Sequence, residues 1–111
     1  MAPDAPRKGD FVIVTFDPQA GHEQRGRRPA LVVSHDLFNE RTGLCIACPI
    51  TAAVRPYPFH VRVPEGLAVS GTVMVDQVKS IDFRSRDVKR LACAPDAVLE
   101  EVLSILDACI Y

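Results

Sequence analysis

Residues 17–34 read Asp17-Pro-Gln-Ala-Gly-His-Glu-Gln-Arg-Gly-Arg-Arg-Pro-Ala-Leu-Val-Val-Ser34. Residues 17–28 of this stretch are mostly polar, with two glycines, one histidine, one glutamate and three arginines, which is typical of a loop. The second half contains Ala30-Leu31-Val32-Val33, an apolar run that predicts a buried strand. An ionisable loop that leads into a rigid strand is an arrangement in which functional side chains are often held.

The rest of the chain consists of short strand-like segments separated by turns. Residues 11–16 are β-branched or aromatic, and residues 44–51 form an apolar run that suits a strand buried on both faces. Residues 76–81 continue the strand before them or bend away from it. Strands are expected at residues 11–16, 28–34, 44–51, 59–63, 71–75 and 88–91.

Two helical segments are expected. Residues 36–40 predict one helical turn that is capped by Ser34 and buries Leu37 and Phe38. Pro95 suits the first position of a C-terminal helix. The apolar face of this helix comprises Val98, Leu99, Val102, Leu103, Leu106 and Ile110. Together the segments predict a mainly β (α+β) fold, either a small barrel or a two-layer sheet.

Length and charge limit the possible functions. The 111 residues predict a single domain, residues 1–111, in which residues 1–8 are expected to be flexible. Because the formal net charge is −1, binding to nucleic acid would need a local basic patch or a dimer that pools two patches. The sequence contains neither an apolar run long enough to span a membrane nor the apolar core of a signal peptide. We therefore expect a cytoplasmic protein that does not associate with a membrane.

No metal or cofactor is expected. The sequence lacks a phosphate-binding glycine loop, a His-Glu-x-x-His motif and a Gly-x-Ser-x-Gly motif. Cys45 and Cys48 are three residues apart, and on a strand they would face opposite sides, which suits two buried small apolar residues better than a shared metal.

Arginines are the main candidates for chemistry. Arg28 is favoured as a functional residue because it stands beside a proline at the start of a strand, whereas Arg25, Arg86, Lys89 and Arg90 are interpreted as solvated charges. His22 and Glu23 suit proton transfer and a solvated loop about equally well. Thr51 either caps the end of its strand or points into a cleft, and capping ranks first.

These residues resemble the MazF/PemK-type toxins, the ribonuclease half of bacterial toxin–antitoxin pairs. The matching motifs occur in order between positions 9 and 83: Gly9-Asp10, Phe16-Asp17-Pro18, Gly21-x-Glu23-Gln24, Arg28-Pro29-Ala30-Leu31-Val32-Val33-Ser34, Thr42-Gly43, Pro49-Ile50-Thr51, Tyr57-Pro58-Phe59 and Asp76-Gln77-Val78-Lys79-Ser80-Ile81.

The resemblance implies a Src-homology-3-like β-barrel of the MazF/PemK/CcdB type and a homodimer. It implies metal-independent cleavage of single-stranded RNA to 2′,3′-cyclic phosphate and 5′-hydroxyl ends, and neutralisation by a MazE-like antitoxin with an acidic flexible tail. The implied catalytic residues are Arg28, Thr51 and Glu23. The implied RNA-binding residues are His22, Gln24, Arg27, Arg55, Gln77, Lys79 and Ser80. Arg27 stands where close relatives often carry a histidine, and arginine cannot act as a base near neutral pH.

Two other functions remain open from the sequence. The first is a CcdB-like, non-enzymatic toxin that binds DNA gyrase and depends on its C-terminal helix rather than on Arg28 and Thr51. The second is a binding module that has lost catalysis through Arg27.

Overall fold

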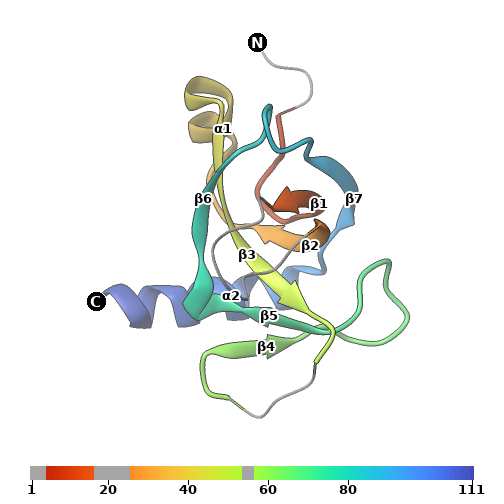
Figure 1. Cartoon of the computed structure of the whole chain (residues 1–111). Coiled ribbons are helices and arrows are strands. Elements are labelled where there is room, and N and C mark those ends of the chain that lie inside the picture. The colour runs from red at the N-terminus through yellow and green to blue at the C-terminus, as the bar shows by residue number, and fades with distance from the viewer. Residues whose placement is uncertain (1–4, 17–25, 54–56) are drawn as a thin grey trace.

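A computed structural model describes residues 5–16, 26–53 and 57–111 (Figure 1). Within these residues the chain forms β1 Asp10–Phe16, β2 Gly26–Val32, α1 Asp36–Thr42, β3 Leu44–Thr51, β4 His60–Arg62, β5 Thr72–Met74, the 3-10 helix η1 Val75–Gln77, β6 Lys79–Asp82, β7 Lys89–Cys93 and α2 Asp96–Ile110. The predicted mainly β fold with a C-terminal helix is confirmed.

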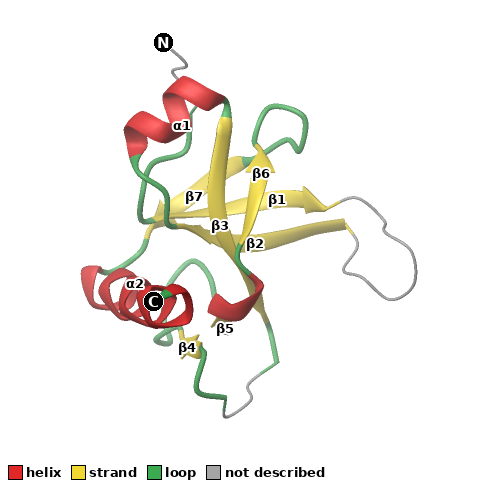
Figure 2. Cartoon of the chain, turned by 90° about the vertical axis from the view of Figure 1, so that its left-hand side faces the viewer, coloured by secondary structure: helices red, strands yellow, loops and turns green. Residues whose placement is uncertain are grey.

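Strand β3 is the centre of the sheet because it is hydrogen-bonded along both edges. One edge pairs with β2, and the other pairs first with β6 and then with β5. The pairings among the described strands are antiparallel, in the order β4-β5-β3-β2-β1-β7, with β6 beside β3. Figure 2 shows that the sheet bends strongly around β3 and is barrel-like without closing completely.

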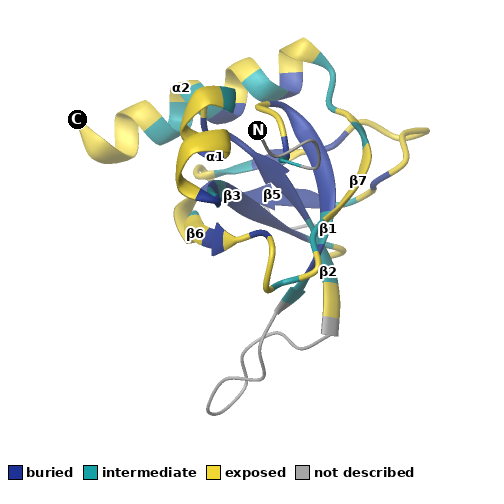
Figure 3. Cartoon of the chain, turned by 90° about the horizontal axis from the view of Figure 1, so that it is seen from above, coloured by how far each residue is buried: buried dark blue, intermediate teal, exposed yellow. Residues whose placement is uncertain are grey.

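Two apolar clusters cover the two faces of this sheet. The helix-side cluster comprises Phe11, Leu31, Val33, Cys48, Ile50, Val61, Val63, Val69, Val73, Val75, Val98 and Val102. The inner cluster comprises Val12, Val14, Ala30, Val32, Cys45, Ala47, Ile81 and Phe83. Successive residues of β1, β2 and β3 alternate between the clusters, as the period of a strand requires. Figure 3 shows the burial of these central strands.

Helix α2 covers the helix-side cluster, and most residues of its predicted apolar face pack against that cluster. Val98 and Val102 are buried, and Leu99, Leu103 and Leu106 pack at the edge of the cluster. Pro95 is the N-cap rather than the first helical residue. The expectation for Ile110 is wrong, since this residue is exposed where the helix runs past β6 (Figure 1).

Helix α1 differs from its prediction in cap and burial. The His35 side chain, not Ser34, accepts the hydrogen bond from the Leu37 N–H at 3.0 Å. Leu37 and Phe38 are exposed, and Asn39 is the buried residue of the helix.

The buried Asn39 side chain accounts for the position of α1. Its amide donates to the Pro6 carbonyl at 2.8 Å, and its oxygen accepts from the Ser34 hydroxyl. Ser34 in turn accepts the Ile46 N–H at 2.8 Å. Because buried polar groups need hydrogen-bond partners, this network holds α1, β3 and the N-terminal segment together.

No helix within the described ranges is long and apolar enough to cross a membrane.

The cysteine prediction is confirmed for the pair on β3. Cys45 lies in the inner cluster and Cys48 in the helix-side cluster, on opposite faces. Burial raises the pKa of each thiol to about 12.

We expect alkylation to separate the four cysteines into two classes. With a pKa of about 12, about one Cys45 or Cys48 thiol in ten thousand is ionised at pH 8, and neither is accessible. Cys93 and Cys109 are exposed. Native protein treated with iodoacetamide should carry two labels by mass spectrometry, and denatured protein should carry four. Rapid labelling of Cys45 or Cys48 in the native state would contradict this packing.

Candidate functional site

Arg28 and Thr51, the two candidate catalytic residues that the structure describes, share one face of the sheet. The ladder between β2 and β3 pairs Val32 with Ala47 and Ala30 with Pro49. The hydrogen-bonded ladder ends at the Ala30–Pro49 pair, and its register extended by two residues predicts Arg28 opposite Thr51. Because side chains two positions apart on a strand point to the same face, Arg28 shares the face of Ala30 and Thr51 shares the face of Pro49. The face is that of the inner cluster, which ends in this direction at Val14, the β1 partner of Arg28.

Thr51 is the last residue of β3 and is hydrogen-bonded as the higher-ranked alternative predicted. Its hydroxyl oxygen accepts the Ala53 N–H at 3.2 Å, which caps the end of the strand. A threonine hydroxyl has one donor and two acceptor positions, so capping leaves the O–H able to donate to a ligand. Thr51 is only partly buried, and the two alternatives, capping and facing a binding surface, are therefore compatible.

Thr72 extends this face onto the neighbouring strand, and the sequence analysis did not identify it. It pairs with Thr51 across the β3–β5 ladder. The Thr72 side chain is buried, and its hydroxyl has no hydrogen-bond partner among the described residues. The only signal in the sequence is a polar residue within an apolar strand, and its position beside Thr51 depends on strand pairing.

The close approach of β3 and β5 depends on Gly71. Its φ angle is +123°, and a Cβ at this position would lie 2.1 Å from the Thr51 carbonyl oxygen. No side chain fits there without moving the end of β3. Thr51 can therefore occupy its observed position only because residue 71 is a glycine.

The segment 77–80 contributes residues to different faces. Lys79 pairs with Ala47 and therefore shares the face of Thr51, whereas Ser80 pairs with Ile46 and lies on the opposite face. Gln77 is exposed in η1. Lys79 thus shares the face of Thr51, at a level four residues earlier along β3, and Ser80 does not.

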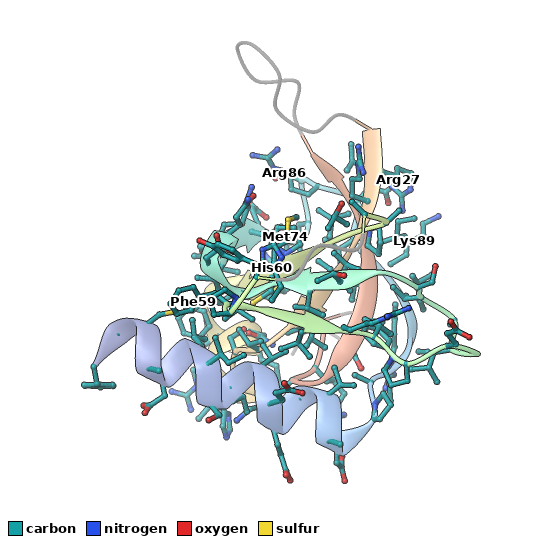
Figure 4. The ribbon with its side chains drawn as sticks, turned by 90° about the horizontal axis from the view of Figure 1, so that it is seen from below. Arg27, Phe59, His60, Met74, Arg86 and Lys89 are labelled. Atoms are coloured by element: carbon teal, nitrogen blue, oxygen red, sulfur yellow. The ribbon has the colours of Figure 1, made fainter. Side chains whose placement is uncertain are left out.

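Arg27 also lies on the opposite face from Arg28. It is paired with Thr15, and its guanidinium donates to the Thr15 hydroxyl at 2.7 Å and to Asp87 at 3.0 Å. Figure 4 shows Arg27 and Arg86 near the end of the β1–β2 ribbon that is far from α2. Part of the Arg27 charge is therefore neutralised by the protein itself.

A His–Asp pair lies farther along the same face as Thr72. His60 is opposite Met74, and its Nε2 atom lies 3.2 Å from Asp76 Oδ1 (Figure 4). The Tyr57 ring is 4.7 Å away between centroids. The Nδ1 atom of His60 is buried without a hydrogen-bond partner among the described residues.

A cavity of about 720 Å³ opens elsewhere on the inner cluster. Val12 and Phe83 form part of its wall. Asp10 and Arg90 also line it and form an ion pair, with Arg90 Nε 3.1 Å from Asp10 Oδ1. None of the predicted site residues that the structure describes lines this cavity. It lies on the same face of the sheet as Arg28 and Thr51, but beside Asp10 and Val12 near the start of β1.

Four predicted site residues lie outside the described residues: His22, Glu23, Gln24 and Arg55. Among residues 5–16, 26–53 and 57–111, no three His, Cys, Asp or Glu residues are grouped so that they could hold a metal ion.

The fold and sequence match a family of known proteins. Residues 7–110 match the model for the PemK-like, MazF-like toxin of type II toxin–antitoxin systems. The chain is 44% identical over 92 residues to the endoribonuclease toxin MazF of Escherichia coli strain K12, covering 82% of each chain. It is 42% identical over 107 residues to the endoribonuclease toxin ChpB of the same strain, covering 91% of this chain and 90% of ChpB.

Solved structures agree with this match. The crystal structure of MazF (Form-I) from Deinococcus radiodurans has a TM-score of 0.87 to this chain, with 49% identity over 96% of both chains. A MazE–MazF crystal structure (Form-II) from the same organism gives the same values. The chain is thus a toxin of the type II toxin–antitoxin class. It belongs to the PemK-like, MazF-like toxin family.

We expect substitution of Gly71 to disturb the Thr51 position. Gly71→Ala adds a methyl group that collides with the Thr51 carbonyl oxygen. Gly66→Ala is a matched control, because Gly66 also has a positive φ angle (+88°) but has no atom within 4 Å of the added Cβ. The free energy of unfolding of the Gly66→Ala control should fall by about 1–2 kcal/mol, from backbone strain alone. The free energy of unfolding of Gly71→Ala, measured by thermal unfolding, should fall by at least about twice as much. Equal losses in the two variants would contradict the close approach of Gly71 to the Thr51 backbone.

Proposed function

We propose that this protein is a sequence-specific, metal-independent endoribonuclease that cleaves single-stranded RNA, including mRNA, to 2′,3′-cyclic phosphate and 5′-hydroxyl ends. The observation that carries this proposal is the β2–β3 ladder, whose register supports a position for Arg28 and Thr51 on the same face of the sheet. The general class follows from family membership: the chain is an endoribonuclease toxin of the MazF type.

RNA supplies the nucleophile of this reaction. The ribose 2′-hydroxyl attacks the adjacent phosphorus, the bond from phosphorus to the 5′-oxygen breaks, and a cyclic phosphate remains. Negative charge increases on the phosphoryl oxygens in the transition state. Arg28 offers a planar fork of donors to these oxygens, and the Thr51 hydroxyl offers one more.

Arg28 suits this role for a structural reason. It stands in a strand that is paired with β1 on one side and followed by Pro29, so little backbone freedom is lost when it binds a phosphate. Removing one such donor commonly lowers the rate about 100- to 1,000-fold, or about 3–4 kcal/mol.

The proton acceptor is proposed to be Glu23 or His22. A base at this step contributes about 100-fold or more. Arg27 does not fill this role, because a guanidinium stays protonated. Arg27, Gln24, Arg55, Gln77, Lys79 and Ser80 remain proposed RNA-binding residues, and the position of Lys79 on the Thr51 face favours it most directly.

The proposed partners follow from the family. We propose a homodimer that acts in the cytoplasm and is neutralised by a MazE-like antitoxin with an acidic tail. The crystal structures of MazE–MazF from Deinococcus radiodurans support an antitoxin partner. The alternative of a CcdB-like gyrase-binding toxin is not favoured, since relatives at 38–44% identity are named endoribonucleases.

The test of this function is to incubate the purified protein, free of antitoxin, with a long single-stranded RNA in EDTA and to map the new ends. We expect cuts at one short sequence, each leaving a 5′-hydroxyl and a cyclic phosphate. Absence of cleavage by folded protein over many sequences would overturn the proposal. Cleavage that starts only after Mg²⁺ is added would contradict metal independence.

Variants of the two aligned residues should lose activity while remaining folded. Arg28→Ala is expected to lower kcat about 100- to 1,000-fold, because a donor to the developing charge is removed. Arg28→Lys should retain part of the rate, since it keeps the charge but not the fork. Thr51→Val removes the hydroxyl and nearly preserves its volume, and a loss of about tenfold or more is expected for one donor.

Arg41→Ala is the matched control, because Arg41 is an exposed arginine in the last turn of α1. Its rate should stay within about twofold of the wild type, as expected for a surface change away from a site. Near-normal cleavage by Arg28→Ala, with an unchanged unfolding temperature, would count against the proposed mechanism.

A further inference from the structure

We propose that Arg62 is a second phosphate-binding residue, which holds the RNA strand at a phosphate other than the one that is cleaved. This inference rests on the proposed ribonuclease function and names a residue that the family motifs do not include. It predicts that the RNA track runs from β2 across β3 and β5 to β4.

The argument begins with the strand register. Arg62 is opposite Thr72 in the β4–β5 ladder, and Thr72 is opposite Thr51 in the β5–β3 ladder. The continued β3–β2 register then leads from Thr51 to Arg28. Arg62, Thr72 and Thr51 thus form one transverse row on a single face of β4, β5 and β3, and the extended register predicts Arg28 of β2 as its fourth member.

The guanidinium of Arg62 is accessible to a ligand. Its side chain is 65% exposed. Its Nη2 atom lies 3.9 Å from Oε2 of Glu65, and the side chain of that glutamate is 92% exposed. A pair of this kind is weak in water and is readily exchanged for a phosphate, which matches the guanidinium fork better.

A second and independent feature of the row is the Thr72 hydroxyl. The Thr72 side chain is 2% exposed, and its Oγ1 atom has no partner among the described residues. Buried hydroxyls are nearly always hydrogen-bonded in folded proteins, and each exception needs an explanation, of which a functional role is one. This unpartnered group lies between Thr51 and Arg62, where a strand that joins the two arginines would cross.

The spacing of the row suits a polynucleotide. Neighbouring strands are about 4.8 Å apart, so Arg62 and Thr51 are separated by roughly 10 Å at the backbone. A stacked strand advances about 3.4 Å per phosphate, and an extended strand advances farther. Arg62 should therefore contact a phosphate about one to three nucleotides from the cleaved one.

The first test measures binding and catalysis separately. The probe is an RNA that carries the cleavage sequence with a 2′-deoxy nucleotide at the scissile position, which removes the nucleophile. Arg62→Ala should weaken binding about fivefold to tenfold and should reduce the slope of log K against log salt by about 0.7, the value for one lost contact with a single strand. On cleavable RNA its KM should rise while kcat stays within about twofold.

Two variants give the matched comparisons. Arg41→Ala makes the same change of charge away from the row and should leave affinity and salt slope unchanged. Glu65→Gln removes the carboxylate that competes with phosphate for Arg62 and should tighten binding about twofold. If Arg62→Ala and Arg41→Ala have the same small effect, the proposal is wrong.

The second test locates the phosphate. In a series of probes, each phosphate in turn is replaced by a neutral methylphosphonate. For the wild type, one replacement about one to three nucleotides from the scissile phosphate should weaken binding by the same factor as Arg62→Ala. For Arg62→Ala that replacement should have no further effect. Independent effects at every position would overturn the assignment.

The two proposals fail in different ways. If wild-type protein neither binds nor cleaves RNA, the ribonuclease proposal fails and Arg62 has no role in it. If the wild type cleaves RNA and Arg28→Ala does not, but Arg62→Ala keeps the normal KM and salt slope, only the role of Arg62 is overturned.

Discussion

The structure depends on the hydrogen bonding of strand β3 along both of its edges. One edge binds β2, and the other binds β6 and β5, so this strand joins the five-stranded part of the sheet to the small β4–β5 part. Its residues alternate between two apolar clusters, which makes slippage unfavourable, because a shift by one residue would turn Cys45 and Cys48 to the wrong faces. Thr51 stands at the end of this strand, and its position is therefore set by the whole sheet.

The same constraint separates neighbouring arginines. Arg27 and Arg28 are adjacent in the sequence and point to opposite faces, because strand β2 has a period of two. Arg27 donates hydrogen bonds to Thr15 and Asp87. Arg28 instead lies on the face of the sheet that carries Thr51, Thr72 and Lys79. One surface of the sheet thus collects donors suited to phosphate, although the net charge of the chain is −1. Local arrangement, rather than overall charge, supports RNA as the ligand.

The proposed site stands on a rigid platform of paired strands. Arg28, Thr51 and Thr72 belong to paired strands, and Gly71 permits the approach of β5 to the Thr51 backbone. A strand residue has fewer positions open to it than a loop residue, so the hydrogen-bond donors proposed for catalysis are held in place before substrate binds, as charge stabilisation in a transition state requires. The proposed base, Glu23 or His22, belongs to the residues that the structure does not describe.

The sequence alone determined the element types, most strand positions and the family. An unbroken apolar run identified β3 as doubly buried and periodicity identified α2 as amphipathic, because both patterns are local. Such patterns failed for Leu37, Phe38 and Ile110, since an apolar residue on a short or terminal helix is buried only if another element reaches it. The motifs named Arg28 and Thr51 but gave no neighbours for them. The position of Thr72 and Arg62 in one row with Thr51, and the placement of Ser80 on the other face, were decided by tertiary structure, because strand register is a relation between segments far apart in the chain.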